Sequence, residues 1–453
     1  KRHGDAPQGE PDEFGNYPGP MDPFPAQRGE FYTYDDLSVE LVDYVRDMGY
    51  THIEVMPLME HPFDGSWGYQ TTGYYAATSR YGDPQQLMHF IDACHEAGIG
   101  VIMDWVPGGF CADSHGLATF NGHMLFEHEI HPNWGTHKFD FARGEVRSFL
   151  VSNVLYWLEN FHVDGIRMDG VSSMLYLNFG IDDPGQKKFN KYGTEEDLDA
   201  SAFIRQVNCA VEAHYPDVMM MAEESTAWPL VTYPPQDGGL GFHYKWDMGW
   251  MNDTLDYFKK TSDERRENLG KLTFSMMYAW NEHYILPFSH DENVHGKATI
   301  VQKMYGEYEG KFPQARALYL YMAIHPGKML DFMGNEFAQL REFDESREQD
   351  WMVLKYPNHD DFHRYRRALN EAYLANEAFW SREYDPEAFR WLDCAHPELD
   401  ACAIWRDGHD GAVLAAFNFG DTELADYTLT LPRAGKLTKL LDTDWQCFGG
   451  RTE

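Results

Sequence analysis

The sequence predicts an α/β protein, a (β/α)8 TIM barrel followed by a small C-terminal antiparallel β domain. Helix-like and strand-like segments alternate more than five times over about 380 residues, as they do in parallel α/β folds. The strand-like segments are continuous apolar runs, which is typical of parallel strands buried on both faces. Each run that can be placed ends in Asp, Glu, Arg or His, and barrel enzymes carry their active sites at that end of the strands.

The chain is expected to contain three regions. Residues 1–30 are rich in Gly, Pro and charge and are predicted to be an irregular arm. Residues 31–385 are predicted to form the barrel. Residues 386–453 are predicted to form the β domain, which is expected to be incomplete because it ends at FGGRTE after few strands.

Individual elements follow from the spacing of apolar residues. The predicted helix–strand pairs are 37–48 with 52–58, 87–97 with 100–106, 146–157 with 161–169 and 200–214 with 218–225, and a later strand runs into 284–293. Alternating residues predict further strands at 412–419 and 425–431. The glycine cluster at 238–241 neither follows a clear strand nor opens a helix, so a loop is predicted there and not a phosphate-binding turn.

Composition limits the class of partner. The 453 residues carry a formal net charge of −36 and include 13 Trp and 27 Tyr. This charge repels nucleic acid and anionic membranes, so neither is an expected partner, whereas a neutral, hydroxyl-rich ligand suits both the charge and the aromatic content. The six cysteines form no C-x-x-C pair, which favours a reducing cytoplasm over a disulfide scaffold.

Charged residues concentrate at four predicted strand ends. They are Asp104, Arg167, Asp169, Glu223, Glu224, His290, Asp291 and Glu292. Retaining cleavage of a glycosidic bond needs one ionised and one protonated carboxyl group about 5 Å apart, and neighbouring strand ends can supply that spacing. Arg167 lies two residues before Asp169, on the same face of the strand, and is expected to keep it ionised. Repulsion among the other carboxylates is expected to raise the pKa of a glutamate, as a general acid requires.

A metal centre is the alternative chemistry for these residues. Two loose groups of side chains have ligand character, His290, Asp291, Glu292 and His295 in one and His123, His128 and His131 in the other. Neither matches H-E-x-x-H or an EF-hand loop. No metal and no organic cofactor is therefore expected.

The four strand ends resemble the ordered motifs of the α-amylase superfamily of retaining glycoside hydrolases and transglycosidases. The resemblance implies that Asp169 in DGIRMD is the nucleophile, Glu223 in AEEST the general acid/base and Asp291 in SHDEN the carboxylate that stabilises the transition state. It implies substrate-binding positions at Tyr69, Asp104, Arg167 and His290. It assigns no role to Glu224.

The sequence around these strand ends is similar to one subfamily, the 1,4-α-glucan branching enzymes. The similar segments are 59–82, 222–231, 238–257, 288–304 and 325–344. This resemblance implies transfer of a cleaved α-1,4-glucan chain to a 6-hydroxyl group, which makes α-1,6 branches in glycogen. A hydrolytic α-amylase-like enzyme and a weakly active glucan-binding protein are the alternatives. No motif sets the transferred chain length or the oligomeric state.

The chain departs from the subfamily pattern at three positions. Gly109 stands where the pattern has His after DWVPG, and the loss of that side chain is expected to weaken productive sugar binding by about 1–3 kcal/mol. Gly170 and Asn293 replace small apolar residues beside Asp169 and Glu292. The family's opening barrel strand and its amino-terminal carbohydrate-binding domain are expected to lie outside this chain.

Overall fold

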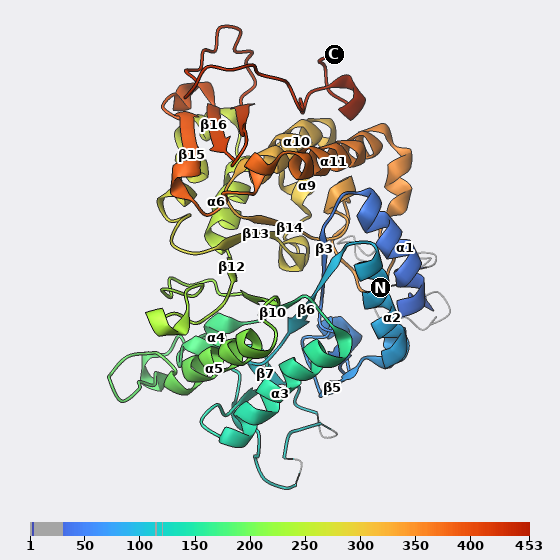
Figure 1. Cartoon of the computed structure of the whole chain (residues 1–453), viewed down its shortest axis with the longest axis vertical. Helices are drawn as coiled ribbons and strands as arrows, with labels where there is room; N and C mark the ends of the chain where they lie inside the picture. The colour runs from blue at the N-terminus through green and yellow to red at the C-terminus, as the bar shows by residue number, and fades with distance from the viewer. Residues whose placement is uncertain (1, 4–29, 114–115, 120) are drawn as a thin grey trace. The chain divides into compact units, whose positions relative to one another are not determined.

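The structure is a computed structural model that describes residues 2–3, 30–113, 116–119 and 121–453 (Figure 1). Nearly all of the predicted arm over 1–30 lies outside these described residues. The chain divides into two compact units. The N-terminal unit comprises Lys1–Trp246 with Glu345–Glu348, and the C-terminal unit comprises Asp247–Asp344 with Gln349–Glu453.

Five parallel strands form the sheet of the N-terminal unit, in the order β3, β6, β10, β11, β12. Their bounds are β3 His52–Val55, β6 Gly100–Trp105, β10 Gly165–Met168, β11 Met219–Ala222 and β12 Tyr244–Trp246. The helices of this unit are α1 Tyr34–Asp47, α2 Pro84–Glu96, α3 Gly144–Phe161, α4 Val171–Leu175 and α5 Leu198–His214. The four helix–strand pairs predicted in this region are therefore confirmed.

Helix ends are set by local chemistry. Thr33 and Asp36 form a capping box at the start of α1, and Asp83 does the same with Gln86 at the start of α2. Glycines in the left-handed region follow both helices, Gly49 with φ 77° and Gly98 with φ 73°. These residues turn the chain directly into β3 and β6, so each strand begins close to the end of its helix.

The strand register divides the sheet into two faces. Glu54 pairs with Ile102, Arg167 with Asp104 and Met221 with Arg167. Because paired residues of parallel strands point the same way, charged side chains share one face, here called the inner face. The outer face carries the alternate residues, which are apolar on β6, β10 and most of β11 and are buried together with apolar side chains of α1, α2, α3 and α5. Figure 1 shows these helices around the strands of the unit.

Short strands follow the carboxyl ends of the main strands and hold the loops there. A hairpin joins β4 Met59–Glu60 to β5 Gly73–Ala77, and a three-stranded sheet has the order β7, β9, β8. The bounds of these three strands are β7 Gly109–Phe110, β8 Glu127–Ile130 and β9 His137–Phe139. Near the start of the described chain, β1 Arg2–His3 pairs antiparallel with β2 Glu30–Phe31.

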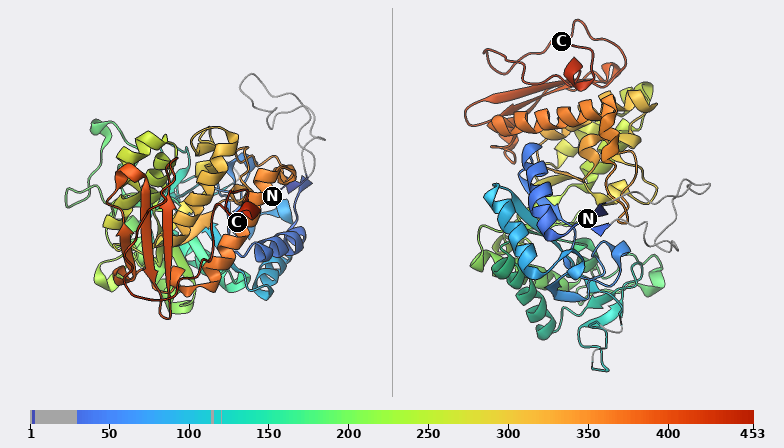
Figure 2. Two further views of the ribbon diagram at one scale, coloured as in Figure 1. Left: turned by 90° about the horizontal axis from the view of Figure 1, so that it is seen from above. Right: turned by 90° about the vertical axis from the view of Figure 1, so that its right-hand side faces the viewer.

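The C-terminal unit contains one parallel strand pair and one antiparallel sheet. Strand β13 Tyr284–Phe288 pairs with β14 Lys328–Asp331, and β15 Phe389–Asp393, β16 Ala401–Asp407 and β17 Ala412–Asn418 follow in sheet order. Its helices are α6 Met248–Phe258, α7 Ser262–Asn268, α8 Gly270–Thr273, α9 Ile300–Lys303, α10 Tyr308–Ile324 and α11 Pro357–Ala375. Helix α10 contacts both α11 and β17, and Figure 2 shows the two long helices of this unit beside its antiparallel sheet.

Two local predictions for the loops and the β domain had opposite outcomes. The loop at 238–241 is confirmed, since it follows a short 3-10 turn and contains no strand or helix. The strand at 425–431 is wrong. Residues 427, 429 and 431 keep the alternating partial burial of a strand, but this segment pairs with no neighbour in the described part of the chain. None of the described helices combines the length and apolar character that a bilayer span requires.

Candidate functional site

A buried arginine joins two carboxylates at the carboxyl end of β10. Arg167 Nη1 donates to both oxygens of Asp104, at 2.8 and 2.7 Å, and to Oδ1 of Asp169 at 2.8 Å. The hydroxyl of Tyr69 donates to the same Asp104 at 2.5 Å. The side chain of Arg167 is 1% exposed, whereas that of Asp169 is 23% exposed. Solvent and ligands therefore reach the network at Asp169.

The sheet register explains why these groups meet. Arg167 lies opposite Asp104 on the neighbouring strand, and Asp169 follows Arg167 by two residues on the same face. From β12, the indole of Trp246 covers the guanidinium at 4.2 Å. The single cation Arg167 thus pairs with both Asp104 and Asp169, so these three ionised groups together carry a net negative charge.

Burial and charge act against each other in this network. Burial raises the pKa of Asp104 to about 7, although the Arg167 guanidinium lowers it. Burial lowers the pKa of Arg167, but electrostatic interactions with Asp104, Tyr69 and Asp169 raise it by more, so that it stays well above its ordinary value. Burial and Asp104 also raise the pKa of Tyr69 far above its ordinary value. Tyr69 is therefore a permanent donor and Arg167 a permanent cation.

Glu54 is an inner-face residue that the sequence reasoning missed. It is partly buried on β3, on the face that carries Asp104 and Arg167. Burial raises its pKa to about 8, with Arg167 lowering it and Asp104 raising it. The available signal was a carboxylate at the inward position of HIEV, an otherwise apolar strand followed by a turn.

Glu223 lies at the end of the next strand, β11. Its Oε2 accepts a hydrogen bond of 2.8 Å from the N–H of Gly170, the residue after Asp169. Gly170 has φ 62°, and the N–H of Val171 donates to the Glu223 carbonyl at 3.0 Å. The turn after β10 therefore hydrogen-bonds to Glu223 at the end of β11. This holds the two predicted catalytic residues, Asp169 and Glu223, at neighbouring strand ends.

The neighbouring Glu224 points to the outer face. It is fully buried, and its Oε2 accepts from Lys245 Nζ at 2.7 Å. Its Oε1 accepts from the Ser172 hydroxyl and the Thr226 N–H, both at 2.9 Å. These contacts account for Glu224 as a structural residue, which agrees with the absence of a catalytic role in the sequence interpretation.

His290 and Asp291 form a pair of their own in the C-terminal unit. They lie in a 3-10 turn, His290–Asn293, directly after β13. The His290 side chain is buried, Asp291 is 52% exposed, and His290 Nε2 lies 3.4 Å from Asp291 Oδ1. Tyr69, Asp104, Arg167, Asp169 and Glu223 are thus brought together in one unit, and the two remaining predicted residues lie together at a strand end of the other.

Gly109 has a structural reason to be glycine. It pairs with Lys138 in the short β7–β9 ladder, and its carbonyl accepts from the Tyr74 hydroxyl at 2.6 Å. A Cβ atom at this position would lie 2.5 Å from the carbonyl oxygen of His137. A histidine at 109 therefore does not fit this backbone unless β9 moves.

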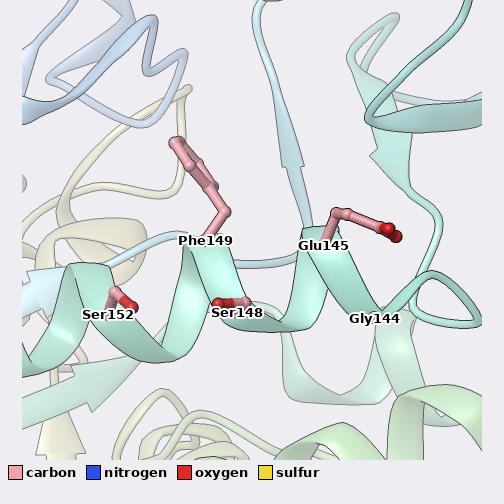
Figure 3. A pocket seen from close by; sticks show the side chains of 5 residues that line it. All are labelled: Gly144, Glu145, Ser148, Phe149 and Ser152. Carbon is pink, nitrogen blue, oxygen red and sulfur yellow. The ribbon is translucent and has the colours of Figure 1, made fainter.

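The two groups of side chains with ligand character do not come together as a metal site among the described residues. The described residues contain no group of three or more His, Cys, Asp or Glu side chains placed to hold a metal ion. His131 instead stacks on Trp134, and burial lowers its pKa to about 4. An open hollow on α3 carries none of the predicted site residues and is lined by Gly144, Glu145, Ser148, Phe149 and Ser152 (Figure 3).

Comparison with known proteins agrees with this geometry. The family described as alpha amylase, catalytic domain, matches residues 38–124 and 126–337, and alpha amylase, C-terminal all-beta domain, matches residues 391–453. A solved alpha-amylase-type structure from Salmonella typhimurium superposes with a TM-score of 0.68 at 18% identity, covering 90% of this chain and 76% of that one. The predicted barrel with a C-terminal β domain is confirmed, and it is the fold of the α-amylase class.

Curated relatives indicate which subfamily of the α-amylase class the chain belongs to. The chain is 48% identical over 429 residues to 1,4-alpha-glucan branching enzyme GlgB of Thiobacillus denitrificans, covering 93% of this chain and 58% of that protein. It is 49% identical over 424 residues to the enzyme of the same name from Desulfitobacterium hafniense, covering 93% and 67%. The chain belongs to the 1,4-alpha-glucan branching enzymes of the α-amylase family. It spans about three fifths of the length of the first of these relatives.

Proposed function

We propose that this chain carries the catalytic part of a retaining 1,4-α-glucan branching enzyme that works on glycogen in the cytoplasm. The observation that carries the proposal is the Arg167 network, which holds Asp169 at an open strand end in a chain 48% identical to a branching enzyme. The six cysteines, none in a disulfide, suit a reducing compartment.

The first half-reaction makes a covalent sugar ester. A carboxylate oxygen of Asp169 bonds to the anomeric carbon of an α-1,4-linked glucose as the bond from that carbon to the leaving oxygen breaks. Glu223 gives its proton to the departing 4-oxygen. Arg167 favours the ionised Asp169 because it donates to that carboxylate at 2.8 Å. The family resemblance gives the stabilisation of charge on the sugar to Asp291, with His290 beside it at 3.4 Å.

The second half-reaction transfers the chain. The 6-hydroxyl oxygen of an acceptor glucan attacks the anomeric carbon while Glu223 takes the hydroxyl proton, and the bond to Asp169 breaks. Tyr69 and Asp104 hold the nucleophile's surroundings in place through their 2.5 Å hydrogen bond. The product is an α-1,6 branch, and Asp169 and Glu223 return to their starting protonation states.

Incubation with amylose tests this function. Branching lowers the iodine stain without new reducing ends, and treatment of the product with a debranching enzyme then releases short chains. Asp169→Asn is expected to abolish the change, because the amide cannot form the ester. New reducing ends in proportion to the loss of stain would instead mean hydrolysis, and unchanged stain with retained glucan binding would mean a binding protein.

A further inference from the structure

An exposed indole lies beside the residue that follows Asp169. Trp134 occupies the loop between β8 and β9 and is 50% exposed. A Cβ atom at Gly170 would lie 3.6 Å from Cη2 of Trp134 and 3.8 Å from its Cζ3. The indole edge therefore lies near Gly170, whose N–H donates to Glu223, and only the space that a Cβ atom would fill separates the two.

Neighbouring side chains hold this indole in place. Its ring stacks on the ring of His131, with centroids 3.9 Å apart and an interplanar angle of 9°. His131 is 3% exposed, and its Nδ1 accepts from the N–H groups of Asn133 and Trp134 at 3.3 and 3.4 Å. Phe179 supports the same group with its ring 6.3 Å from the Trp134 ring. The buried ring of His131, with Phe179 beside it, thus holds the solvent-exposed indole in a fixed position.

Gly170 is the matching feature on the strand side. A side chain there would contact the indole edge and lie 3.3 Å from the Ser173 hydroxyl, on a backbone with φ 62°. With hydrogen alone at Gly170, the space between the indole edge and the Asp169 strand end stays open. The departure of this chain from the subfamily at residue 170 therefore coincides with an aromatic surface next to the nucleophile.

The chemistry of this surface suits a sugar. An indole has a flat apolar face and a polar N–H, and the C–H faces of pyranose rings pack on such faces. We propose that Trp134 is a substrate-contacting residue that stacks on the glucose unit next to the one that Asp169 attacks. This inference rests on the proposed glucan chemistry, but it concerns binding and does not depend on whether water or a hydroxyl group is the acceptor.

Binding to an inactive variant tests the proposal. In an Asp169→Asn background, which does not turn over its ligand, maltoheptaose binding is measured by calorimetry with and without Trp134→Ala and Trp134→Tyr. We expect Trp134→Ala to raise the Kd about tenfold and Trp134→Tyr to restore much of the affinity, because the smaller ring still stacks. Trp380→Phe is the matched control, since Trp380 is 39% exposed and lies in the C-terminal unit.

The outcomes separate this inference from the proposed function. Unchanged maltoheptaose affinity in both Trp134 variants, with thermal unfolding like that of the parent, would overturn the inference even if the wild-type chain branches amylose. Loss of affinity in Trp134→Ala with recovery in Trp134→Tyr would support it even if the wild-type chain only hydrolyses amylose. If Trp134→Ala fails to fold, the comparison of Trp134→Tyr with Trp134→Leu decides in the same way.

Discussion

The two faces of the sheet in the N-terminal unit carry buried charge in opposite arrangements. On the inner face, Arg167 serves both Asp104 and Asp169, and Asp169 remains open to solvent. On the outer face, Lys245 pairs with Glu224 and also donates to the Thr226 carbonyl at 2.9 Å, and the side chains of Lys245 and Glu224 are 7% and 0% exposed. The inner arrangement has an excess of negative charge and an access route, whereas the outer one is neutral and closed.

The contrast between the two faces shows how two adjacent glutamates take on different roles. Glu223 and Glu224 have the same side chain, but successive residues at a strand end point to opposite faces. The Glu223 carboxylate accepts from the backbone turn after Asp169, whereas the Glu224 carboxylate is enclosed by Lys245, Ser172 and Thr226. A saturated, paired carboxylate cannot exchange protons with a substrate at low cost, so its place is structural.

The sharpest test of the comparison is to neutralise each glutamate in turn. Glu223→Gln is expected to lower kcat on amylose by about 10²–10⁴-fold, the usual contribution of a general acid/base, with little change in the free energy of unfolding. Glu224→Gln leaves Lys245 buried without a charged partner and is expected to cost about 3–5 kcal/mol in stability, with kcat per folded molecule retained. Iodine-stain kinetics and urea unfolding measure the two quantities. A large loss of kcat in folded Glu224→Gln would contradict the division between the faces.

The second test asks whether each face needs its charge. Lys245→Met alone is expected to destabilise the chain by about 3–5 kcal/mol, because Glu224 is left buried and unpaired. The double variant Lys245→Met with Glu224→Leu is expected to recover most of that loss, since apolar side chains can replace a closed ion pair. On the inner face, Arg167→Met with Asp104→Leu is expected to stay inactive in the amylose assay. Recovery of activity by that double variant would show that the inner pair, too, is only structural.

Much of this arrangement could be predicted from the sequence, because it depends on local rules. Helical spacing ended by Gly49 and Gly98 located the first helices, and the two-residue spacing of Arg167 and Asp169 placed them on one face. Lys245 was missed because the partner of a buried ion pair lies on another strand, and its identity depends on register. The false strand at 425–431 has the same cause, since alternation is local whereas a pairing partner is not.

A third test concerns the glycine that departs from the family pattern. Gly109→His was expected from the sequence to restore a sugar contact. The structure predicts instead a loss of about 1–3 kcal/mol in stability and no gain in activity, because the new Cβ would meet the His137 carbonyl at 2.5 Å. Gly109→Ala should share the loss, whereas Gly144→Ala, with no atom within 4 Å of the new Cβ, should not. Urea unfolding of the three variants measures this, and a more active, equally stable Gly109→His would show that β9 yields readily.

A fourth test is a pH dependence that comes from Glu54. Burial raises its pKa to about 8 from an ordinary value of 4.5, so the folded chain holds a proton between these values that the unfolded chain releases. This group therefore favours folding most below pH 4.5, and its contribution falls as pH rises to about 8. Glu54→Gln keeps the neutral form, so its stability relative to the wild type should rise from pH 5 to pH 8 and then level off in urea unfolding.

Glu129 supplies a control of opposite sign for this last test. Burial raises its pKa, but hydrogen bonds from Lys138 and Lys188 lower it further, to about 2. Both the folded and unfolded forms are ionised above pH 5, so the difference between Glu129→Gln and the wild type should stay constant from pH 5 to pH 9. Asp104, whose pKa is raised to about 7, contributes its own pH dependence to the free energy of unfolding of every variant. A flat profile for Glu54→Gln against the wild type would mean that Glu54 is well solvated and does not belong to the inner-face charge network.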